Sequence, residues 1–341
     1  ASVISINKSC FSKCQSLEKV IFLQPSSVTI INDYAFKGCE LLKQITLPYL
    51  TKCIGYSAFQ NCKSLINVYI PPSAKTIEGS AFLECSSLTK IILSPYTTSI
   101  ENNAFQFCQS LREIIIPSSV TNIGNDTFNG CSSLLKITIP SSVTNIGEKC
   151  FNGCSSLNEV IFELPSSLTT IESSTFNECI SLKEINFPFS VTLIETNAFR
   201  KCSSLTKVTI PSSVSTIRGW VFEGCESLTQ IEIPSSITNL NFYTFLNCSS
   251  LTQVSIPSSV VSIGEGVFNG CSSLKELVIP SSVKYIGNSA LKDCTSLEKI
   301  TIPTSLELKY TEINKNVKVI KISEDGTIVE QNSKCYICWI F

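Results

Sequence analysis

Cysteine is the residue type that offers this sequence the most chemistry. The chain has 341 residues, of which 18 are cysteine and none is histidine. A cysteine can act as a nucleophile, bind a metal, form a disulfide or carry a lipid. The lack of histidine excludes Ser-His-Asp and Cys-His catalysis, histidine general bases and histidine-ligated metal sites. Which of the remaining roles the cysteines fill depends on their spacing.

Thirteen of the cysteines recur at a fixed interval. The step is 23 residues, except for steps of 25 from Cys14 to Cys39 and from Cys154 to Cys179. A leucine lies three positions after each of them, and a phenylalanine lies three positions before each except the last, where Leu291 replaces it. The thirteen are Cys14, Cys39, Cys62, Cys85, Cys108, Cys131, Cys154, Cys179, Cys202, Cys225, Cys248, Cys271 and Cys294. This period, with L-x-x-I-x-I at its centre, is typical of a leucine-rich repeat.

The elements of one repeat can be predicted from residues 128–154. Ile137 and Ile139 alternate with a threonine, which predicts a short, half-buried strand. Val143 and Ile146 predict a second, shorter extended segment. The spacing from Phe151 to the next cysteine suits a single helical or 3₁₀ turn.

A single coil of this length cannot bury its own apolar side chains, so the coils must stack. The sequence predicts a leucine-rich repeat solenoid of about 13 stacked 23-residue coils. We expect a parallel β-sheet on the concave face and short helical or 3₁₀ turns opposite. The thirteen thiols would then form one interior column of small apolar groups. Cys10 and Cys150 occupy a position that is alanine in other repeats, which leaves Cys53, Cys335 and Cys338 outside the pattern.

We predict three segments along the chain. Residues 1–303 form the repeat array, residues 304–333 form a polar cap with a hairpin, and residues 334–341 form a lipidation tail. The two 25-residue repeats share Cys-Phe and Val-Ile-Phe at an offset of 140 residues. We infer a duplicated six-coil block, in which the insertions at Leu23-Gln24 and Glu163-Leu164 make matching bulges.

The repeat resembles the BspA-like (Treponema-type) leucine-rich repeat family, whose pattern runs I-P-x-x-V-x-x-I-G-x-x-A-F-x-x-C-x-x-L-x-x-I-x. Residues 116–139 match that pattern closely, from Ile116-Pro117 through Phe128 and Cys131 to Ile137. The resemblance extends over about residues 3–303, and after Pro303 it fails, because Lys309 falls where an inward isoleucine is expected. It implies a surface protein of the kind found in bacteria and parasitic protists, which adheres to host matrix or to other cells.

Two outward features of the coils are candidates for binding. One strand position alternates in charge, for example Lys90, Glu113 and Lys136, which favours a self-neutralising ladder of ion pairs over a site for a charged ligand. Trp220 and Tyr243 occupy the same repeat position in successive coils, so stacking predicts rings about 5 Å apart. With the adjacent Phe242 they could anchor a partner or pack sideways on a neighbouring loop. Tyr34 occupies the same position far away in the sequence and is a further candidate for partner binding.

The last four residues, Cys338-Trp339-Ile340-Phe341, fit the C-a-a-X pattern for prenylation, with geranylgeranyl favoured by the final phenylalanine. Cys335 would be a palmitoylation site that supplies a second membrane signal. The alternatives for this tail are a strand of the cap and a Cys-x-x-Cys redox or zinc pair.

Taken together, these features predict a membrane-associated, non-catalytic protein that mediates protein–protein interaction or adhesion. The alternative is a cytosolic prenylated scaffold on the inner leaflet, so the side of the membrane stays open. We expect a protein partner and no cofactor, metal or small-molecule substrate. The net charge of −1 and the scarcity of arginine do not favour nucleic acid. A cysteine enzyme built on Cys53 is disfavoured, because no histidine can activate the thiol.

Overall fold

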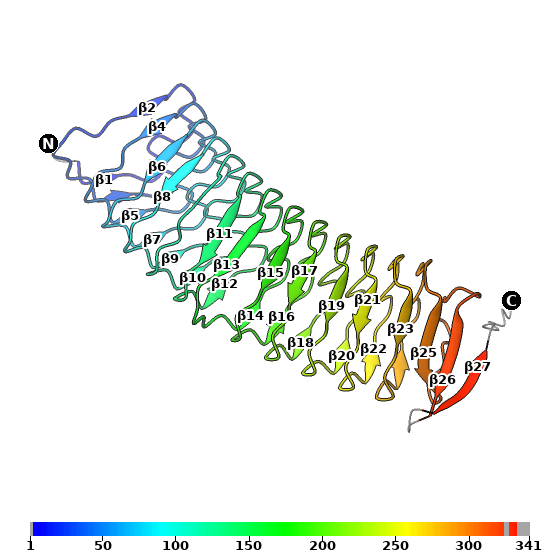
Figure 1. Cartoon of the computed structure of the whole chain (residues 1–341). Coiled ribbons are helices and arrows are strands. Elements are labelled where there is room, and N and C mark those ends of the chain that lie inside the picture. Colours follow the sequence, from blue (N-terminus) through cyan, green and yellow to red (C-terminus); the bar gives the residue numbers. More distant parts are fainter. Residues whose placement is uncertain (1–2, 324–326, 333–341) are drawn as a thin grey trace. The chain divides into compact units, whose positions relative to one another are not determined.

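The structure is a computed structural model that describes residues 3–323 and 327–332. The chain divides into two compact units, Ala1–Leu168 with Ser174–Ile180, and Thr169–Ser173 with Ser181–Phe341. We call them unit 1 and unit 2. Each unit is a β-solenoid in which every coil contributes strands to parallel ladders (Figure 1). The predicted leucine-rich repeat solenoid is therefore confirmed.

Each coil crosses two strand columns. The front column contains the strand that follows the repeat leucine, and the second column contains the extended segment before the Phe–Cys stretch. In unit 1 the front strands are β2 (Lys19–Val20), β4 (Gln44–Ile45), β6 (Asn67–Tyr69), β8 (Lys90–Ile92), β11 (Lys136–Ile139) and β13 (Glu159–Phe162). The second strands there are β1 (Ser5–Ile6), β3 (Ile30–Ile31), β5 (Cys53–Ile54), β7 (Thr76–Ile77), β9 (Ser99–Ile100), β10 (Asn122–Ile123) and β12 (Asn145–Ile146).

Unit 2 repeats the same two columns. Its front strands are β15 (Glu184–Asn186), β17 (Lys207–Thr209), β19 (Gln230–Glu232), β21 (Gln253–Ser255), β23 (Glu276–Val278) and β25 (Lys299–Pro303). Its second strands are β14 (Thr170–Ile171), β16 (Leu193–Ile194), β18 (Thr216–Ile217), β20 (Asn239–Leu240), β22 (Ser262–Ile263) and β24 (Tyr285–Ile286).

The C-terminal part of unit 2 differs from a regular coil. Strand β26 (Lys318–Ile322) pairs in parallel with β25, and β27 (Ile328–Asn332) pairs antiparallel with β26. Residues 304–317 therefore form one more coil, shortened so that Lys299 aligns with Lys318 after 19 residues rather than 23. Lys309 is exposed in this coil, which agrees with the break in the repeat pattern.

The third side of the coil is not a helix, contrary to the prediction. Asp126, Phe128 and Gly130 donate their backbone N–H groups to carbonyl oxygens of the next coil, each at 2.8 Å. Asp126 has a φ of 55° and Gly130 a φ of 73°, both in the left-handed region. Left-handed residues break the regular turn that a helix requires, and they direct every second N–H toward the neighbouring coil. In the described residues this side is a run of turns with no helix.

The core consists of stacked columns of identical side chains. The repeat phenylalanines lie ring over ring at 5.2–5.6 Å in unit 1, from Phe11 to Phe176. In unit 2 the stack from Phe199 to Phe268 has spacings of 5.7–5.9 Å. Offset stacking at this distance is favourable beyond the burial of the rings.

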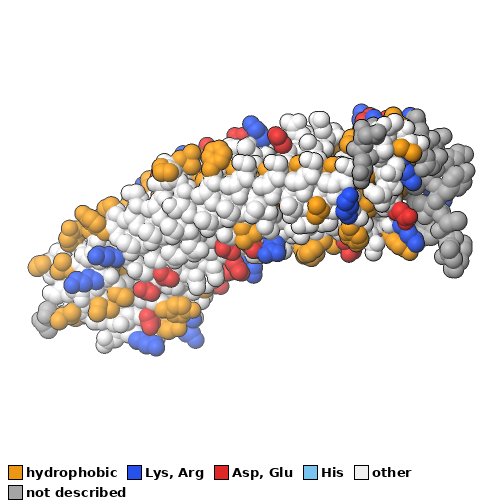
Figure 2. All heavy atoms as spheres, turned by 90° about the horizontal axis from the view of Figure 1, so that it is seen from below, with side chains coloured by type: hydrophobic (Ala, Val, Ile, Leu, Met, Phe, Trp, Pro, Cys, Tyr) orange, Lys and Arg blue, Asp and Glu red, His pale blue; other side chains and the backbone are white. Residues whose placement is uncertain are grey.

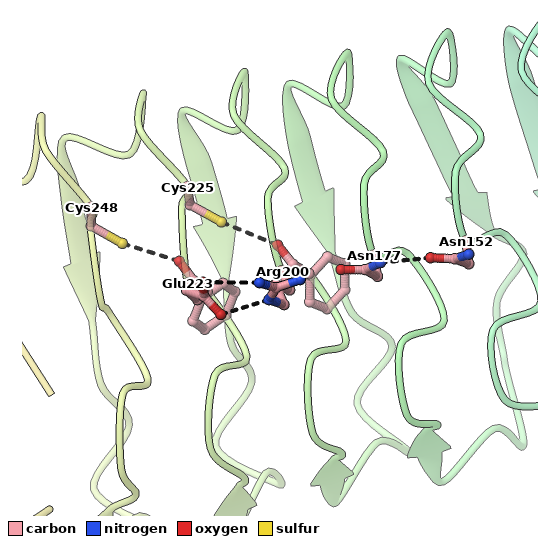
Figure 3. A network of polar contacts seen from close by, with 8 residues as sticks. Asn152, Asn177, Arg200, Glu223, Cys225 and Cys248 are labelled. Atoms are coloured by element: carbon pink, nitrogen blue, oxygen red, sulfur yellow. Dashed lines mark hydrogen bonds and ion pairs between the residues drawn. The ribbon is translucent and has the colours of Figure 1, made fainter. Parts of the chain in front are cut away.

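The repeat cysteines make a second buried column. The sixteen cysteines that the structure describes are all free thiols. A typical member, Cys131, donates its Sγ–H to the carbonyl of Phe105 in the preceding coil at 3.2 Å, and Figure 3 shows the same contact for Cys225 and Cys248. The thiol is thus small and apolar, and it also satisfies a buried carbonyl.

Two cysteines that were expected in the core are accessible to solvent. Cys10 is exposed and Cys14 is half-buried, whereas Cys150, in the same repeat position as Cys10, is buried. Cys10 and Cys14 both lie in the first coil, and within residues 3–323 and 327–332 no earlier coil stacks on it.

The two insertions share a local structure. Residues 24–25 and 164–165 are both cis X-Pro bonds. In each case a serine just after the proline accepts a hydrogen bond from the N–H two residues later, Ser26 from Val28 and Ser166 from Leu168. The six-coil duplication itself stays a prediction.

We expect the free energy of unfolding to fall steeply above pH 9. Burial raises the pKa of Cys85 and Cys131 to about 12, from the usual 9.0. A thiol of the unfolded chain ionises near pH 9.0, whereas the buried thiol of the folded chain stays protonated up to its raised pKa. Between these two pH values, each buried thiol therefore lowers the free energy of unfolding by about 1.4 kcal/mol per pH unit. Urea unfolding followed by circular dichroism on either side of the usual thiol pKa measures the slope. In the variant Cys131→Ala, the free energy of unfolding should fall less steeply with pH, by the contribution of one thiol. An unchanged slope would contradict this account.

Two threonines occupy a core position that is valine in many coils. The hydroxyls of Thr51 and Thr97 are buried without a hydrogen-bond partner. We expect Thr51→Val and Thr97→Val to raise the free energy of unfolding by about 1 kcal/mol each, because an unsatisfied hydroxyl is replaced by a methyl group. Thr127→Val is the matched control, since its buried hydroxyl donates to the carbonyl of Gly124 at 2.8 Å. It should lower stability in the same urea titration.

Candidate interaction surface

Three aromatic side chains of unit 2 form a compact group, which we call the aromatic cluster: Trp220, Phe242 and Tyr243. The rings of Trp220 and Tyr243 stack at 5.6 Å with an interplanar angle of 16°, close to the spacing predicted from the repeat. Phe242 lies edge-on to Trp220 at 4.4 Å. Trp220 and Tyr243 are half-buried, and Phe242 is 42% exposed. The cluster is a semi-exposed apolar feature on a coil edge that is otherwise polar.

The backbone conformation makes this placement unusual. Trp220 has a φ of 57° and Tyr243 a φ of 56°, because their repeat position is left-handed in every coil. Small or polar residues fill the position in most other coils, including Ser57, Ser80 and Asn103, and Tyr34 is an aromatic exception in unit 1. Bulky residues in this region carry an energetic cost of about 1–2 kcal/mol. Folding alone therefore does not favour large aromatics at these two positions.

Two glycines make room for the rings. A side chain on Gly219 would collide with the ring of Phe242, and one on Gly266 would collide with the ring of Tyr243. Gly266 occupies the same left-handed position as Tyr243, one coil further on, with a φ of 57°. The lateral packing considered from the sequence is therefore present for Phe242 and Tyr243, and the anchoring of a partner stays a prediction.

A carboxylate accepts a hydrogen bond at the edge of the aromatic cluster. The hydroxyl of Tyr243 donates a hydrogen bond to Glu265, and this bond raises the pKa of the tyrosine. The edge therefore combines apolar ring surface with one phenol and one exposed carboxylate. Residues of this kind, with an apolar body and a polar end, are frequent anchors of protein interfaces.

Tyr34 has different neighbours in unit 1. Its ring meets Tyr56 edge-on at 5.6 Å, and the ammonium groups of Lys37 and Lys8 lie 5.2 and 5.7 Å from its centroid. Cation–π contacts thus occupy this ring. Tyr34 shares its repeat position with the cluster but not its surroundings.

A second apolar feature lies on the front strands of unit 1 and was not singled out from the sequence. Tyr69, Ile92 and Ile115 are neighbours in one outward column and are 50%, 46% and 75% exposed. We call these three residues the strand stripe. The equivalent residues of unit 2 begin with Asn186, Thr209, Glu232 and Ser255. A comparison of this column between the two halves of the sequence would have found the stripe.

The charged column beside the stripe forms few ion pairs. Among its described residues only Lys299 and Glu276 form an ion pair, at 2.9 Å. Glu113 forms an isolated bridge with Lys90 of strand β8, yet no ion pair within 4.0 Å joins the two side chains in the described part of the chain. The expected ladder of cross-strand ion pairs is thus mostly unformed. On the face drawn in Figure 2, charges of both signs are interspersed.

The third side of unit 2 contains a bidentate ion pair between successive coils. Arg200 binds Glu223 of the next coil through two nitrogens, at 2.6 and 3.2 Å (Figure 3). In unit 1 the equivalent repeat position holds an amide ladder, in which Asn177 donates to Asn152 at 2.6 Å and Asn152 donates to Asn129 at 2.9 Å. These side chains link successive coils and are not free to bind a ligand.

Cys53 lines a shallow depression of about 480 Å³ with Lys52, Lys75 and Glu78. Burial raises the pKa of its thiol, and the nearby Glu78 and Asp33 raise it further. The thiolate that a nucleophile needs is therefore disfavoured.

Residues 3–323 and 327–332 contain no group of three or more Cys, Asp or Glu side chains placed to hold a metal. In the same residues no helix has the length and hydropathy to cross a membrane. The predicted lipidation sites Cys335 and Cys338 lie outside the described residues.

The comparisons with known proteins agree on the kind of repeat. The profile of the family described as BspA type leucine rich repeat region (6 copies) matches residues 4–135, 85–206, 121–250 and 192–321. No curated protein matches the chain. A leucine-rich repeat protein from Bacteroides ovatus has a similar fold, with a TM-score of 0.59 and 24% identity over 91% of this chain and 92% of that one.

A second solved structure is closer in sequence. It is a leucine rich cell surface protein from Faecalibacterium prausnitzii, 31% identical over 75% of this chain and 78% of that one, with a TM-score of 0.53. The repeat pattern, the coil geometry and these matches lead to one conclusion: the chain belongs to the BspA-type leucine-rich repeat family.

Proposed function

We propose that this chain is a non-catalytic adhesion protein, displayed at a cell surface, that binds a protein partner through the aromatic cluster. The BspA-type family is one of protein–protein interaction and adhesion, and the similar Faecalibacterium prausnitzii protein is described as a cell surface protein. The partner would be a matrix or cell-surface protein. These likenesses support surface display, and the residues of unit 2 support the choice of site.

The observation that carries the proposal is the placement of two large aromatics at left-handed positions. The coil is compatible with serine or asparagine there, as Ser80 and Asn103 show. Trp220 and Tyr243 instead stack as half-buried rings on adjacent coils, beside the exposed Phe242. Aromatic residues lose little conformational entropy on binding and bury a large area, so such a group can provide most of the affinity of an interface.

We expect the double variant Trp220→Ser with Tyr243→Ser to bind its partner at least about 30-fold more weakly, as for the loss of an interface hot spot. Solubilised extracellular matrix on a biosensor surface serves as the probe. Serine is the residue of other coils at this position, so circular dichroism and thermal unfolding should show an intact fold.

Tyr34→Ser is the matched control, because it removes an aromatic from the same repeat position in unit 1. It should leave matrix binding unchanged. Equal binding by the double variant and the parent chain would remove the aromatic cluster from the proposal.

The membrane anchor is a separate part of the proposal. The tail Cys338–Phe341 favours prenylation if the chain ends there, and the same tail supports the alternative of a prenylated scaffold on the inner leaflet. The two alternatives differ in which side of the membrane exposes the protein.

Labelling of intact cells distinguishes the two locations. A membrane-impermeant lysine reagent should modify the exposed Lys43 and Lys63 if the protein is displayed outside, and only after lysis if it lies inside. Mass spectrometry of the C-terminal peptide tests the anchor. An unmodified Cys338 with Trp339–Phe341 still attached would exclude prenylation.

A further inference from the structure

The strand stripe of unit 1 is an exposed apolar surface that the fold does not require. Outward positions on the front strands accept polar residues, as Asn186, Thr209 and Ser255 show in unit 2. Contiguous apolar residues on the surface of a soluble protein mark a site of interaction. Tyr69 and Ile92 lie on the paired strands β6 and β8, Ile115 follows the bridge residue Glu113 in the next coil, and each is about half exposed or more. Something of complementary shape and charge should cover them.

The charges beside the stripe indicate what that occupant is. Along the adjacent outward column of unit 1, Asn67, Lys90, Glu113 and Lys136 follow one another, and Glu159 comes next. Lys90 and Glu113 are exposed, and no ion pair within 4.0 Å joins them in the described chain. A face that carries one unpaired lysine and one unpaired glutamate side by side is complementary to its own copy.

We propose that a second copy of this chain docks face to face on the strand stripe, with its coils stacked in the opposite direction. The twofold axis runs parallel to the front strands, between the coil of Lys90 and the coil of Glu113. Such an interface is isologous, since each contact occurs twice.

This arrangement gives both the charged column and the strand stripe complementary residues in the other copy. Lys90 of one copy faces Glu113 of the other, and Ile92 of one faces Ile115 of the other. Tyr69 of one faces Thr138 of the other, and no two like charges oppose each other. A twofold axis along the stacking direction would instead place each coil opposite itself, which leaves Lys90 and Glu113 without partners of opposite charge.

The proposal does not depend on the aromatic cluster, which lies in unit 2. It is tested with the purified full chain alone, whereas the proposed adhesion is tested by binding to matrix. Failure of one therefore leaves the other standing.

Sedimentation equilibrium of the full chain measures the dimer. We expect concentration-dependent dimerisation of the parent chain, and Ile115→Glu should raise the dissociation constant at least about 30-fold, because it places a carboxylate in the apolar contact. Val278→Glu is the matched control, since Val278 is a 55% exposed residue in the same column of unit 2. It should leave the dissociation constant unchanged.

A charge swap tests the orientation. Lys90→Glu brings two glutamates together across the axis and should weaken the dimer about tenfold, and Lys90→Glu combined with Glu113→Lys should restore it. Circular dichroism confirms that each variant is folded. A parent chain that stays monomeric at high concentration, an equal effect of Ile115→Glu and Val278→Glu, or a double swap that fails to restore the dimer would each overturn the proposal.

Discussion

Each coil of this protein depends on the next coil for its hydrogen bonds. The front strands, the second strands and the alternate N–H groups of the third side all bond to a neighbouring coil rather than within their own. An isolated coil would leave these groups unsatisfied and its phenylalanine and leucine exposed, so it has no stable form. Every other feature of the molecule follows from the exact alignment that this stacking imposes.

Exact alignment turns each repeat position into a column. The interior columns place phenylalanine on phenylalanine and cysteine beside the carbonyl of the preceding coil. The outward columns place surface residues next to their equivalents at the strand spacing. A change at one position therefore creates a local feature without disturbing the coil. The aromatic cluster and the strand stripe both arise in this way, from substitution at positions where other coils carry polar residues.

The buried cysteines have a structural role in packing rather than a chemical role as reactive thiolates. Within the stack the thiol is protonated, because burial raises its pKa and because it donates a hydrogen bond to a carbonyl. A chain rich in cysteine is thus poor in reactive thiolates in its core. Cys53 is half-buried and also has a raised pKa. Among the described residues, the features that differ between coils lie on the surface rather than at a reactive thiolate.

The repeat, the front strands, the buried columns and the proximity of Trp220 to Tyr243 could all be predicted from the amino-acid pattern. Such features depend on which residues are apolar at a fixed period, and this period is visible in the sequence. The left-handed turns of the third side became evident in the folded chain, because the i, i+3 spacing of Phe151 and Cys154 suits a helical turn equally well. The folded chain also decided which surface groups pair. Lys90 and Glu113 are as close in the repeat as Glu276 and Lys299, yet only the latter form an ion pair, since the outcome depends on side-chain conformations that no repeat pattern specifies.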